Sequence, residues 1–404
     1  MLQLKNQVMN YSWGSKTAIA TLQGRAASRE PEAELWMGAH PKAPSSALNH
    51  GEWQPLDRLI KSAPKVTLGP EVHARHGRLP FLFKVLAAAE PLSLQAHPNM
   101  AQAKAGFARE DALGVPIAAP ERNYRDDNHK PELICALTPF DALCGFRPAL
   151  ELHELFTQLG ERALAPYAAP ITALQGGQLS ESEALSRVFS SLMRAPKSQQ
   201  VILVETITMA LRSRDRASRF EPSFACAQAL AERYPEDVGV VTSLMLNHVT
   251  LAPGEALFLP AGNLHAYLSG MGLELMANSD NVLRGGLTPK HVDVDELISV
   301  LEFKGQHVQK VLPESCGTRL WRYPTPAHEF ELCKIELDAK PLSIPASNGP
   351  EILIATEGKA VYQTSQYFVE LLAGESAFLK ARKKAYKLTG PGTVYRAIVP
   401  ALRA

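Results

Sequence analysis

The alternation of apolar and polar residues predicts that much of the chain forms β-strands. Residues 81–89 are apolar except for Lys84, and after a Glu-Pro turn residues 92–97 alternate strictly. Alternation places successive side chains on opposite faces of a strand, so the apolar side chains of the second segment would share one face. The other face would carry a hydroxyl, an amide and an imidazole in a row, from Ser93, Gln95 and His97.

Shorter patterns predict further strands on either side of a helical region. Residues 1–60 and 327–399 consist of short pieces separated by proline and glycine, which is typical of strands and turns. Between about 149 and 248, apolar residues recur at helical intervals among good helix formers, so we expect a helical insertion. Residues 100–131 are polar and rich in turn residues, which predicts a long loop, and residues 294–301 predict a short helix.

A short internal repeat connects two of the predicted β regions. The string Gly-Glu-Ala-Leu-Phe-Leu at 254–259 recurs 120 positions later as Gly-Glu-Ser-Ala-Phe-Leu at 374–379. The repeat supports two related β-sandwich or barrel units. Under the same shift His265 corresponds to Ala385, so the second unit would lack this histidine and have a structural or regulatory role.

The predicted organisation is a mainly β protein with a helical insertion. A catalytic β unit would combine residues 1–148 and 249–325, the insertion would cover 149–248, and a second β unit would cover 326–404. A length of 404 residues agrees with two or three domains.

Composition narrows the class of partner. The chain has 46% hydrophobic and 21% charged residues, as a globular protein with a sizeable core does. Its formal charge of +1 gives no reason to expect nucleic acid or an anionic membrane as a partner. Apolar runs are too short for a membrane span, and the amino terminus lacks the apolar run of a signal peptide. The five cysteines form no Cys-x-x-Cys pair and suit reduced thiols, so we expect a cytoplasmic protein.

Four side chains form a candidate metal site because they offer two imidazoles, a carboxylate and an amide oxygen. This mixed set of ligands suits zinc or another divalent first-row metal. The residues are Gln95, His97, Glu132 and His265. Spacing alone is a weak signal, since the last two lie 35 and 168 residues from the first histidine. Structural histidines and a salt-bridged glutamate would explain the same pattern.

A second set of residues suits an anionic ligand. Arg284 precedes Gly285-Gly286, and a glycine pair lets the backbone approach a ligand while arginine offers a planar fork that matches phosphate. No phosphate-binding loop or dinucleotide fingerprint is present, which argues against a nucleotide site. Other candidates in this set are Ser93, Lys84, Lys130, Asp280, Thr288 and Lys290, although each lysine alone is better explained as a solvated surface charge.

Longer strings of residues resemble the type I mannose-6-phosphate isomerase family. The strings occur in the family's order over nearly the whole chain, and the helical region matches least closely. They are Tyr-Ser-Trp-Gly-Ser at 11–15, Phe-Lys-Val-Leu at 83–86, Gln-Ala-His-Pro-Asn at 95–99, His-Lys-Pro-Glu-Leu at 129–133, and Met-Ala-Asn-Ser-Asp-Asn-Val-Leu-Arg-Gly-Gly-Leu-Thr-Pro-Lys at 276–290. Ser12 is a small departure, because Asp or Ala is common there.

The resemblance implies a fold, a cofactor and a substrate. It implies two cupin-like (jelly-roll) β units plus an α-helical domain, and an enzyme that interconverts mannose 6-phosphate and fructose 6-phosphate. One Zn²⁺ per chain would be held by Gln95, His97, Glu132 and His265, and the family's active-site arginine falls on Arg284. The partner would be a small hexose phosphate, and we expect a monomer.

Aldose–ketose isomerisation through a cis-enediol requires a base, an electrophile and a hold on the distant phosphate. We interpret Lys130 as the base, and His129, Glu274 and Asp280 are alternatives. A lysine base would need its pKa lowered by burial or by the metal. Arg284 would stabilise enediolate charge or hold the substrate. Candidate substrate and phosphate contacts are Ser93, Lys84, Lys290, Asp280 and Glu274.

Two other classes of function fit the same residues. A cupin with two histidines and one carboxylate could hold Fe(II) and activate O₂, although Gln95 would fill a position that oxygen needs. A non-catalytic sugar-binding cupin is the other alternative. Arg284 and the complete ligand set argue against it.

Overall fold

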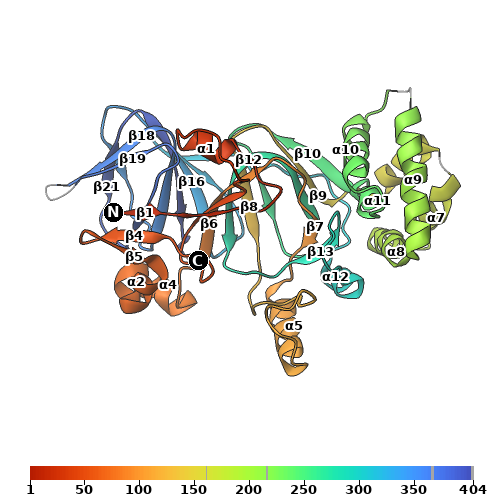
Figure 1. The fold of residues 1–404 in the computed structure, drawn as a ribbon, viewed down its shortest axis with the longest axis horizontal. Helices are drawn as coiled ribbons and strands as arrows, with labels where there is room; N and C mark the ends of the chain where they lie inside the picture. The colour runs from red at the N-terminus through yellow and green to blue at the C-terminus, as the bar shows by residue number, and fades with distance from the viewer. Residues whose placement is uncertain (161, 215–216, 365–367, 402–404) are drawn as a thin grey trace.

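The computed structural model describes residues 1–404 except 161, 215–216, 365–367 and 402–404. Its described part contains two antiparallel sheets, of 12 and 10 strands, and a group of helices at one end of the molecule (Figure 1). The predicted class, mainly β with a helical insertion, is confirmed.

The ten-stranded sheet is built around one long buried strand pair. Its strands are β2 (Gln7–Met9), β3 (Glu34–Met37), β6 (Phe81–Ala88), β7 (Leu94–Ala96), β8 (Glu132–Ala136), β9 (Phe140–Phe146), β10 (Leu246–Leu251), β11 (Ala256–Leu259), β12 (His265–Ala277) and β13 (Leu283–Gly286). All eight residues of β6 are buried, which explains why its sequence is apolar apart from Lys84, whose ammonium is paired. Strand β12 pairs with β6, β7, β8 and β9 and so brings together segments far apart in sequence.

The strand predicted over 92–97 is shorter than expected. Strand β7 covers only Leu94–Ala96, with Ser93 just before it and His97 just after it. Leu94 and Ala96 pack in the core beneath the helical insertion, whereas Leu92 packs against a different cluster. Gln95 therefore points to the face of β7 that lies opposite the helical core.

The twelve-stranded sheet combines both ends of the chain. Its strands are β1 (Leu2–Lys5), β4 (Ser46–Asn49), β5 (Glu52–Pro55), β14 (Glu314–Gly317), β15 (Leu320–Tyr323), β16 (Glu331–Leu337), β17 (Leu342–Ile344), β18 (Glu351–Gln363), β19 (Phe368–Leu372), β20 (Ser376–Leu379), β21 (Tyr386–Thr389) and β22 (Gly392–Ile398). Leu2 pairs with Phe378, so the first strand covers an edge that β20 would otherwise expose. The sheet thus includes residues 2–5, 46–55 and 314–323, which the sequence pattern assigned to the catalytic unit; the domain boundaries themselves stay a prediction.

The helical insertion packs on the ten-stranded sheet (Figure 1, green). Its helices are α6 (Ala149–Leu159), α7 (Ala165–Gln175), α8 (Glu181–Arg194), α9 (Lys197–Ser213), α10 (Glu221–Arg233) and α11 (Gly239–Ser243), with a 3₁₀ turn at Arg162–Leu164. Helix α8 begins at a capping box in which the Ser180 side chain accepts from the backbone of Glu183, and its apolar stripe includes Val188 and Phe189. No helix among the described residues is both long and apolar enough to cross a membrane.

Further helices lie outside the insertion, and the sequence pattern predicted only some of them. They are α1 (Ala18–Leu22), α2 (Leu56–Ser62), α3 (Pro64–Leu68), α4 (Pro70–His76), α5 (Met100–Ala112) and α12 (Val294–Val300). The short helix expected near 294–301 is confirmed. Helix α5 occupies the first part of the expected loop at 100–131, so the prediction of a loop was wrong over residues 100–112. The missed signal is Asn99 followed by Gln102, which form a capping box, while few apolar positions follow it.

The internal repeat corresponds to equivalent turns in the two sheets. Gly254 and Gly374 have φ values of 87° and 80°, and one residue separates each from the start of β11 or β20. This left-handed conformation is one that glycine adopts without strain. The shared turn therefore supports two related β units.

Candidate metal centre and substrate cleft

Three buried side chains converge from separate strands of the ten-stranded sheet. They are His97 after β7, Glu132 at the start of β8 and His265 at the start of β12, and one potential ligand atom of each lies within 4.8 Å of the others. His97 Nε2 lies 3.3 Å from Glu132 Oε1, and His265 Nε2 lies 3.5 Å from Glu132 Oε2. Two imidazole nitrogens and a carboxylate at this spacing form a mixed N/O set that suits a divalent metal.

The hydrogen bonds of the two histidines support this interpretation. His97 Nδ1 bonds to the Asn281 carbonyl at 2.7 Å, and His265 Nδ1 bonds to the Asn263 carbonyl at 3.0 Å. Each Nε2 is buried and has no hydrogen-bond partner among the described residues. A buried polar atom without a partner is costly, and a metal ion between the two nitrogens would satisfy both. The residues present therefore fit a bound metal.

Gln95 lies beside this trio by strand register. It is directly opposite His265 of β12 on one side and Arg284 of β13 on the other. Directly opposed residues of antiparallel strands share a face, with Cβ atoms roughly 5 Å apart. The amide of Gln95 is therefore adjacent to one predicted ligand and to the predicted active-site arginine.

The electrostatics keep Glu132 and His97 in the protonation states that metal binding needs. Burial alone would raise the pKa of Glu132, but Lys130 and His97 hold it well below its usual value. Lys130 Nζ lies 3.0 Å from Glu132 Oε1. Burial lowers the pKa of His97 to about 4, so its imidazole is neutral at neutral pH. Tyr267, which the sequence did not indicate, donates its hydroxyl to Glu132 Oε2 at 3.3 Å, and burial raises its pKa.

A second buried ion cluster surrounds Lys84. Its ammonium lies 2.7 Å from Glu274 Oε2 and 3.6 Å from Glu34 Oε1, and Trp36 Nε1 donates to Glu34 at 2.6 Å. Burial would lower the pKa of Lys84, but the two carboxylates raise it above its ordinary value. Burial raises the pKa of Glu274 against the effect of Lys84. These contacts occupy the ammonium of Lys84 with two carboxylates before any phosphate arrives.

These groups border one cleft of about 540 Å³, a volume typical of small-molecule sites. The cleft brings together most of the predicted site residues. Those that line it are Ser93, Gln95, Lys84, Lys130, Glu132, Glu274, Asp280, Arg284, Thr288 and Lys290. His97 and His265 are buried behind this surface, at 1% and 0% exposure.

Three cationic side chains in the cleft have no hydrogen bond or ion pair to another described residue. Arg284, Lys290 and Arg125 line it, and none of their side-chain nitrogens has a hydrogen bond or ion pair among the described residues. Burial, and then the charge of Arg125, lower the pKa of Arg284, and burial with both arginines lowers the pKa of Lys290. Concentrated positive charge without counter-charges suits an anionic ligand. The sequence pattern did not indicate Arg125, which lies in the expected loop without a motif of its own.

Asp280 contacts two basic side chains from the segment that follows β3. Its Oδ2 lies 2.9 Å from Lys42 Nζ and 3.6 Å from His40 Nε2. Burial would raise the pKa of Asp280, but Lys42 and His40 hold it below its usual value. Asp280 is thus a carboxylate at the cleft surface, and its ion pair with Lys42 competes with a role as proton acceptor.

Two features lie away from the cleft. His129 Nε2 bonds to Glu329 Oε1 at 2.8 Å, toward the carboxyl-terminal β unit, and does not line the cleft.

A Cβ on Gly286 would meet Asp237 Oδ1 at 2.8 Å and Gly239 Cα at 3.0 Å. Gly286 therefore permits close packing against the helical insertion, and the approach of the glycine pair to a ligand stays a prediction.

Comparison with known families gives consistent matches along the chain. The family model for phosphomannose isomerase type I, catalytic domain, matches residues 1–149, and that for phosphomannose isomerase type I, helical insertion domain, matches residues 165–246. The mannose-6-phosphate isomerase of Escherichia coli (strain K12) is 42% identical over 401 residues, covering 98% of this chain and 99% of the relative. That of Schizosaccharomyces pombe is 34% identical over 393 residues, with coverage of 89% and 90%.

Solved structures have the same fold over the full length. A variant of phosphomannose isomerase from Salmonella typhimurium has a TM-score of 0.90 and 39% identity, covering 99% of this chain and 100% of that chain. A zinc-bound mannose 6-phosphate isomerase has a TM-score of 0.87 and 39% identity, with coverage of 99% of each chain. These relatives favour an isomerase over an oxygenase or a non-catalytic sugar-binding protein.

Proposed function

The chain belongs to the type I phosphomannose isomerase family and isomerises mannose 6-phosphate, and we propose that it does so through a cis-enediol with one bound Zn²⁺. The observation that carries the proposal is the pair of buried histidine nitrogens that face Glu132 behind the cleft surface and have no hydrogen-bond partner among the described residues. The product in one direction is fructose 6-phosphate, the corresponding ketose.

Four side chains would hold the ion: Gln95, His97, Glu132 and His265. The two hydrogen bonds from Nδ1 to backbone carbonyls fix the imidazoles in the orientation that presents Nε2. A mannose 6-phosphate isomerase of the same fold has been solved with zinc bound, which supports this choice among divalent metals. When bound, the ion supplies a Lewis acid that polarises a sugar oxygen next to the carbon that loses its proton.

Lys130 is the base that we propose for the proton transfer. Its Nζ lies in the cleft, 3.0 Å from the carboxylate of Glu132, so it is close to the metal centre. In its uncharged form this amine would take the proton from C2 of the open-chain aldose and return it to C1 of the enediol, while the hydroxyl proton of O2 moves to O1. Glu274 is less suited, because Lys84 already holds its carboxylate, and His129 is directed toward the other β unit.

The cationic part of the cleft would bind the phosphate. Arg284 and Lys290 have no counter-charge among the described residues, and Ser93 offers a hydroxyl on the same cleft surface. We assign Lys84 to the sugar rather than to the phosphate, because Glu274 and Glu34 already neutralise it. Together with Asp280, this cluster would bind hydroxyl groups of the open chain. Holding both ends of the substrate aligns C1 and C2 with the base.

The fate of the hydrogen at C2 tests the enediol route. Mannose 6-phosphate labelled with deuterium at C2 is converted in ordinary water, and the product is analysed by NMR. A proton that passes through the exchangeable amine of Lys130 is replaced from solvent, so we expect deuterium to be lost from part of the product. Complete retention of the label at C1 would contradict the proposal and indicate direct hydride transfer.

A further inference from the structure

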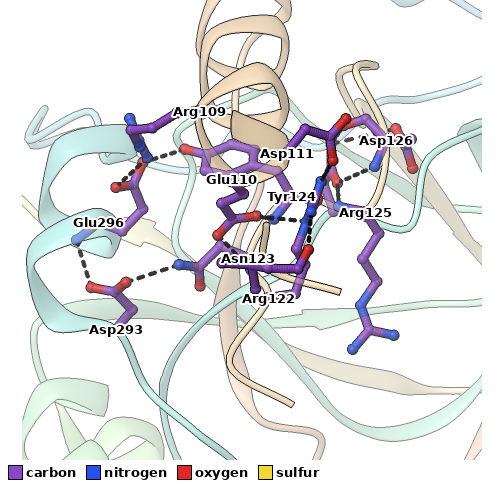
Figure 2. A network of polar contacts seen from close by, with 12 residues as sticks. Arg109, Glu110, Asp111, Arg122, Asn123, Tyr124, Arg125, Asp126, Asp293 and Glu296 are labelled. Atoms are coloured by element: carbon purple, nitrogen blue, oxygen red, sulfur yellow. Dashed lines mark hydrogen bonds and ion pairs between the residues drawn. The ribbon is translucent and has the colours of Figure 1, made fainter. Parts of the chain in front are cut away.

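A buried polar network fixes the loop that follows α5 (Figure 2). The guanidinium of Arg122 is wholly buried, and it bonds to Asp111 Oδ1 at 2.7 Å and to the Tyr124 carbonyl at 2.6 Å. Glu110 accepts the backbone N–H groups of Asn123 and Tyr124 at 3.0 and 2.8 Å. Charge-assisted hydrogen bonds in a buried setting are strong and directional, so the loop has one well-defined path.

The same loop is also attached to helix α12. Asn123 Nδ2 donates to Asp293 Oδ2 at 2.8 Å, and the Tyr124 hydroxyl donates to Glu296 Oε1 at 2.6 Å. Arg109 of α5 pairs with Glu296 Oε2 at 2.7 Å. We call this set the loop clamp: Arg109, Glu110, Asp111, Arg122, Asn123, Tyr124, Asp293 and Glu296.

Immediately after the loop clamp, one asparagine connects the loop to the metal centre. Asn281 Oδ1 accepts the backbone N–H groups of Arg125 and Asp126 at 2.7 and 3.2 Å. The carbonyl of Asn281 accepts from Nδ1 of His97, a proposed metal ligand. The backbone of Arg125 is thus held in fixed relation to the imidazole that faces the metal position.

The side chain of Arg125 takes no part in this network. Figure 2 shows its guanidinium directed away from the clamp, with no bond to the residues drawn. It lines the substrate cleft with Arg284 and Lys290, and no described residue provides it with a hydrogen bond or an ion pair. A rigid backbone that presents a half-buried, unpaired guanidinium beside two other cations is poorly explained by folding, because like charges repel. It is well explained by an anionic ligand.

We propose that Arg125 recognises the phosphate group of the substrate and that the loop clamp positions it for this contact. The proposal rests on the hexose phosphate function above and adds to it a specificity-determining residue. The planar guanidinium matches two phosphate oxygens, so Arg125 would discriminate between mannose 6-phosphate and the unphosphorylated sugar.

Replacing Arg125 by glutamine tests this role. We expect KM for mannose 6-phosphate to rise roughly 10- to 100-fold with kcat changed less than about threefold, as for the loss of a charge-assisted hydrogen bond made equally in ground and transition states. Turnover of D-mannose, measured as kcat/KM, should stay unchanged, and Arg125→Lys should recover part of the affinity. Arg219→Gln is the matched control: it removes an arginine that pairs with Glu154 in the helical insertion and belongs neither to the clamp nor to the cleft, so KM should stay at the parent value.

Binding of glucitol 6-phosphate, followed by calorimetry, separates this proposal from the catalytic one. This hexitol lacks a carbonyl, so its affinity reports phosphate recognition without isomerisation. The proposal is supported if Arg125→Gln binds the hexitol more weakly than the parent enzyme does, while the control variant binds it as the parent does. Parent-like affinity in Arg125→Gln would overturn it, as would an equal loss of kcat/KM for mannose 6-phosphate and D-mannose. Failure of the parent enzyme to bind the hexitol would instead contradict phosphate binding in this cleft.

Discussion

At the scale of single residues, His97 and His265 show how local bonding prepares a site. Each uses Nδ1 on a backbone carbonyl and leaves Nε2 toward Glu132, within a buried pocket that offers it no other partner among the described residues. Lys130 and Tyr267 then contact the two oxygens of the same carboxylate. The carboxylate stays charged although it is buried, because opposite charge and a hydroxyl donor compensate it.

His40 provides a pH-dependent contribution to stability. Burial lowers its pKa to about 4, with Lys42, Lys84 and Lys130 acting in the same direction and Asp280 opposing them. Between pH 6.5 and about 4 the unfolded chain therefore binds a proton that the folded chain does not, so the free energy of unfolding falls as the pH falls through this range. The loss is roughly 3 kcal/mol at most and levels off below pH 4.

His40→Gln should make the free energy of unfolding less dependent on pH. Urea unfolding of metal-free protein at pH 7 and pH 4.5 measures the difference for the parent and the variant. We expect a smaller difference in the variant, whatever its stability at pH 7. The same difference in both proteins would show that His40 is not a main source of the acid sensitivity.

The residue types of the site could be predicted from sequence better than their arrangement. The ligand set followed from resemblance, since separations of 35 and 168 residues carry no geometric information by themselves. Arg125 and Tyr267 were missed because their importance depends on what the fold places beside them. Lys84 was expected near phosphate, whereas its burial between two carboxylates is visible only once β3, β6 and β12 are paired.

At the scale of elements, helix α5 and the loop after it act as one unit. Gly106 allows the ring of Tyr124 to lie against the helix, because a Cβ at this position would come within 2.3 Å of Tyr124 Cε2. Tyr124 is 1% exposed and hydrogen-bonded to Glu296, so it has little room to move. Glycine usually weakens a helix, but packing against Tyr124 requires it at position 106.

Gly106→Ala should therefore destabilise the protein, although alanine is the better helix former. The gain in helix propensity is about 1 kcal/mol, whereas forcing extra volume into a packed site costs roughly 1–3 kcal/mol. Urea or thermal unfolding measures the net change. In a Tyr124→Leu background, which removes most of the ring, the same substitution should be neutral or stabilising. Destabilisation of equal size in both backgrounds would exclude the ring contact as its cause.

Elements with a strong pattern were predictable, and those held by tertiary contacts were not. The apolar run of β6 and the helical periodicity of α8 indicated their structures correctly. Helix α5 was expected to be a loop because its surface is polar and only a few of its residues are buried. Its location is fixed by the loop clamp, whose partners on α12 lie about 170 residues further along the chain.

At the scale of the whole molecule, the chain order and the spatial order differ. Strand β1 pairs with β20 across more than 370 residues, so the amino terminus completes the carboxyl-terminal sheet. His129, next to the proposed base, bonds to Glu329 of the same carboxyl-terminal unit. Pairing across such a distance leaves no local pattern, so the sequence could not show that β1 joins the carboxyl-terminal sheet.

The central claim is that one divalent metal ion on Gln95, His97, Glu132 and His265 is needed for isomerisation. The most direct test measures bound zinc and the rate of mannose 6-phosphate conversion on the same samples, during stepwise removal by a chelator and readdition of Zn²⁺. We expect activity to fall in proportion to bound zinc and to return fully at one Zn²⁺ per chain. Undiminished activity in metal-free enzyme would contradict the account.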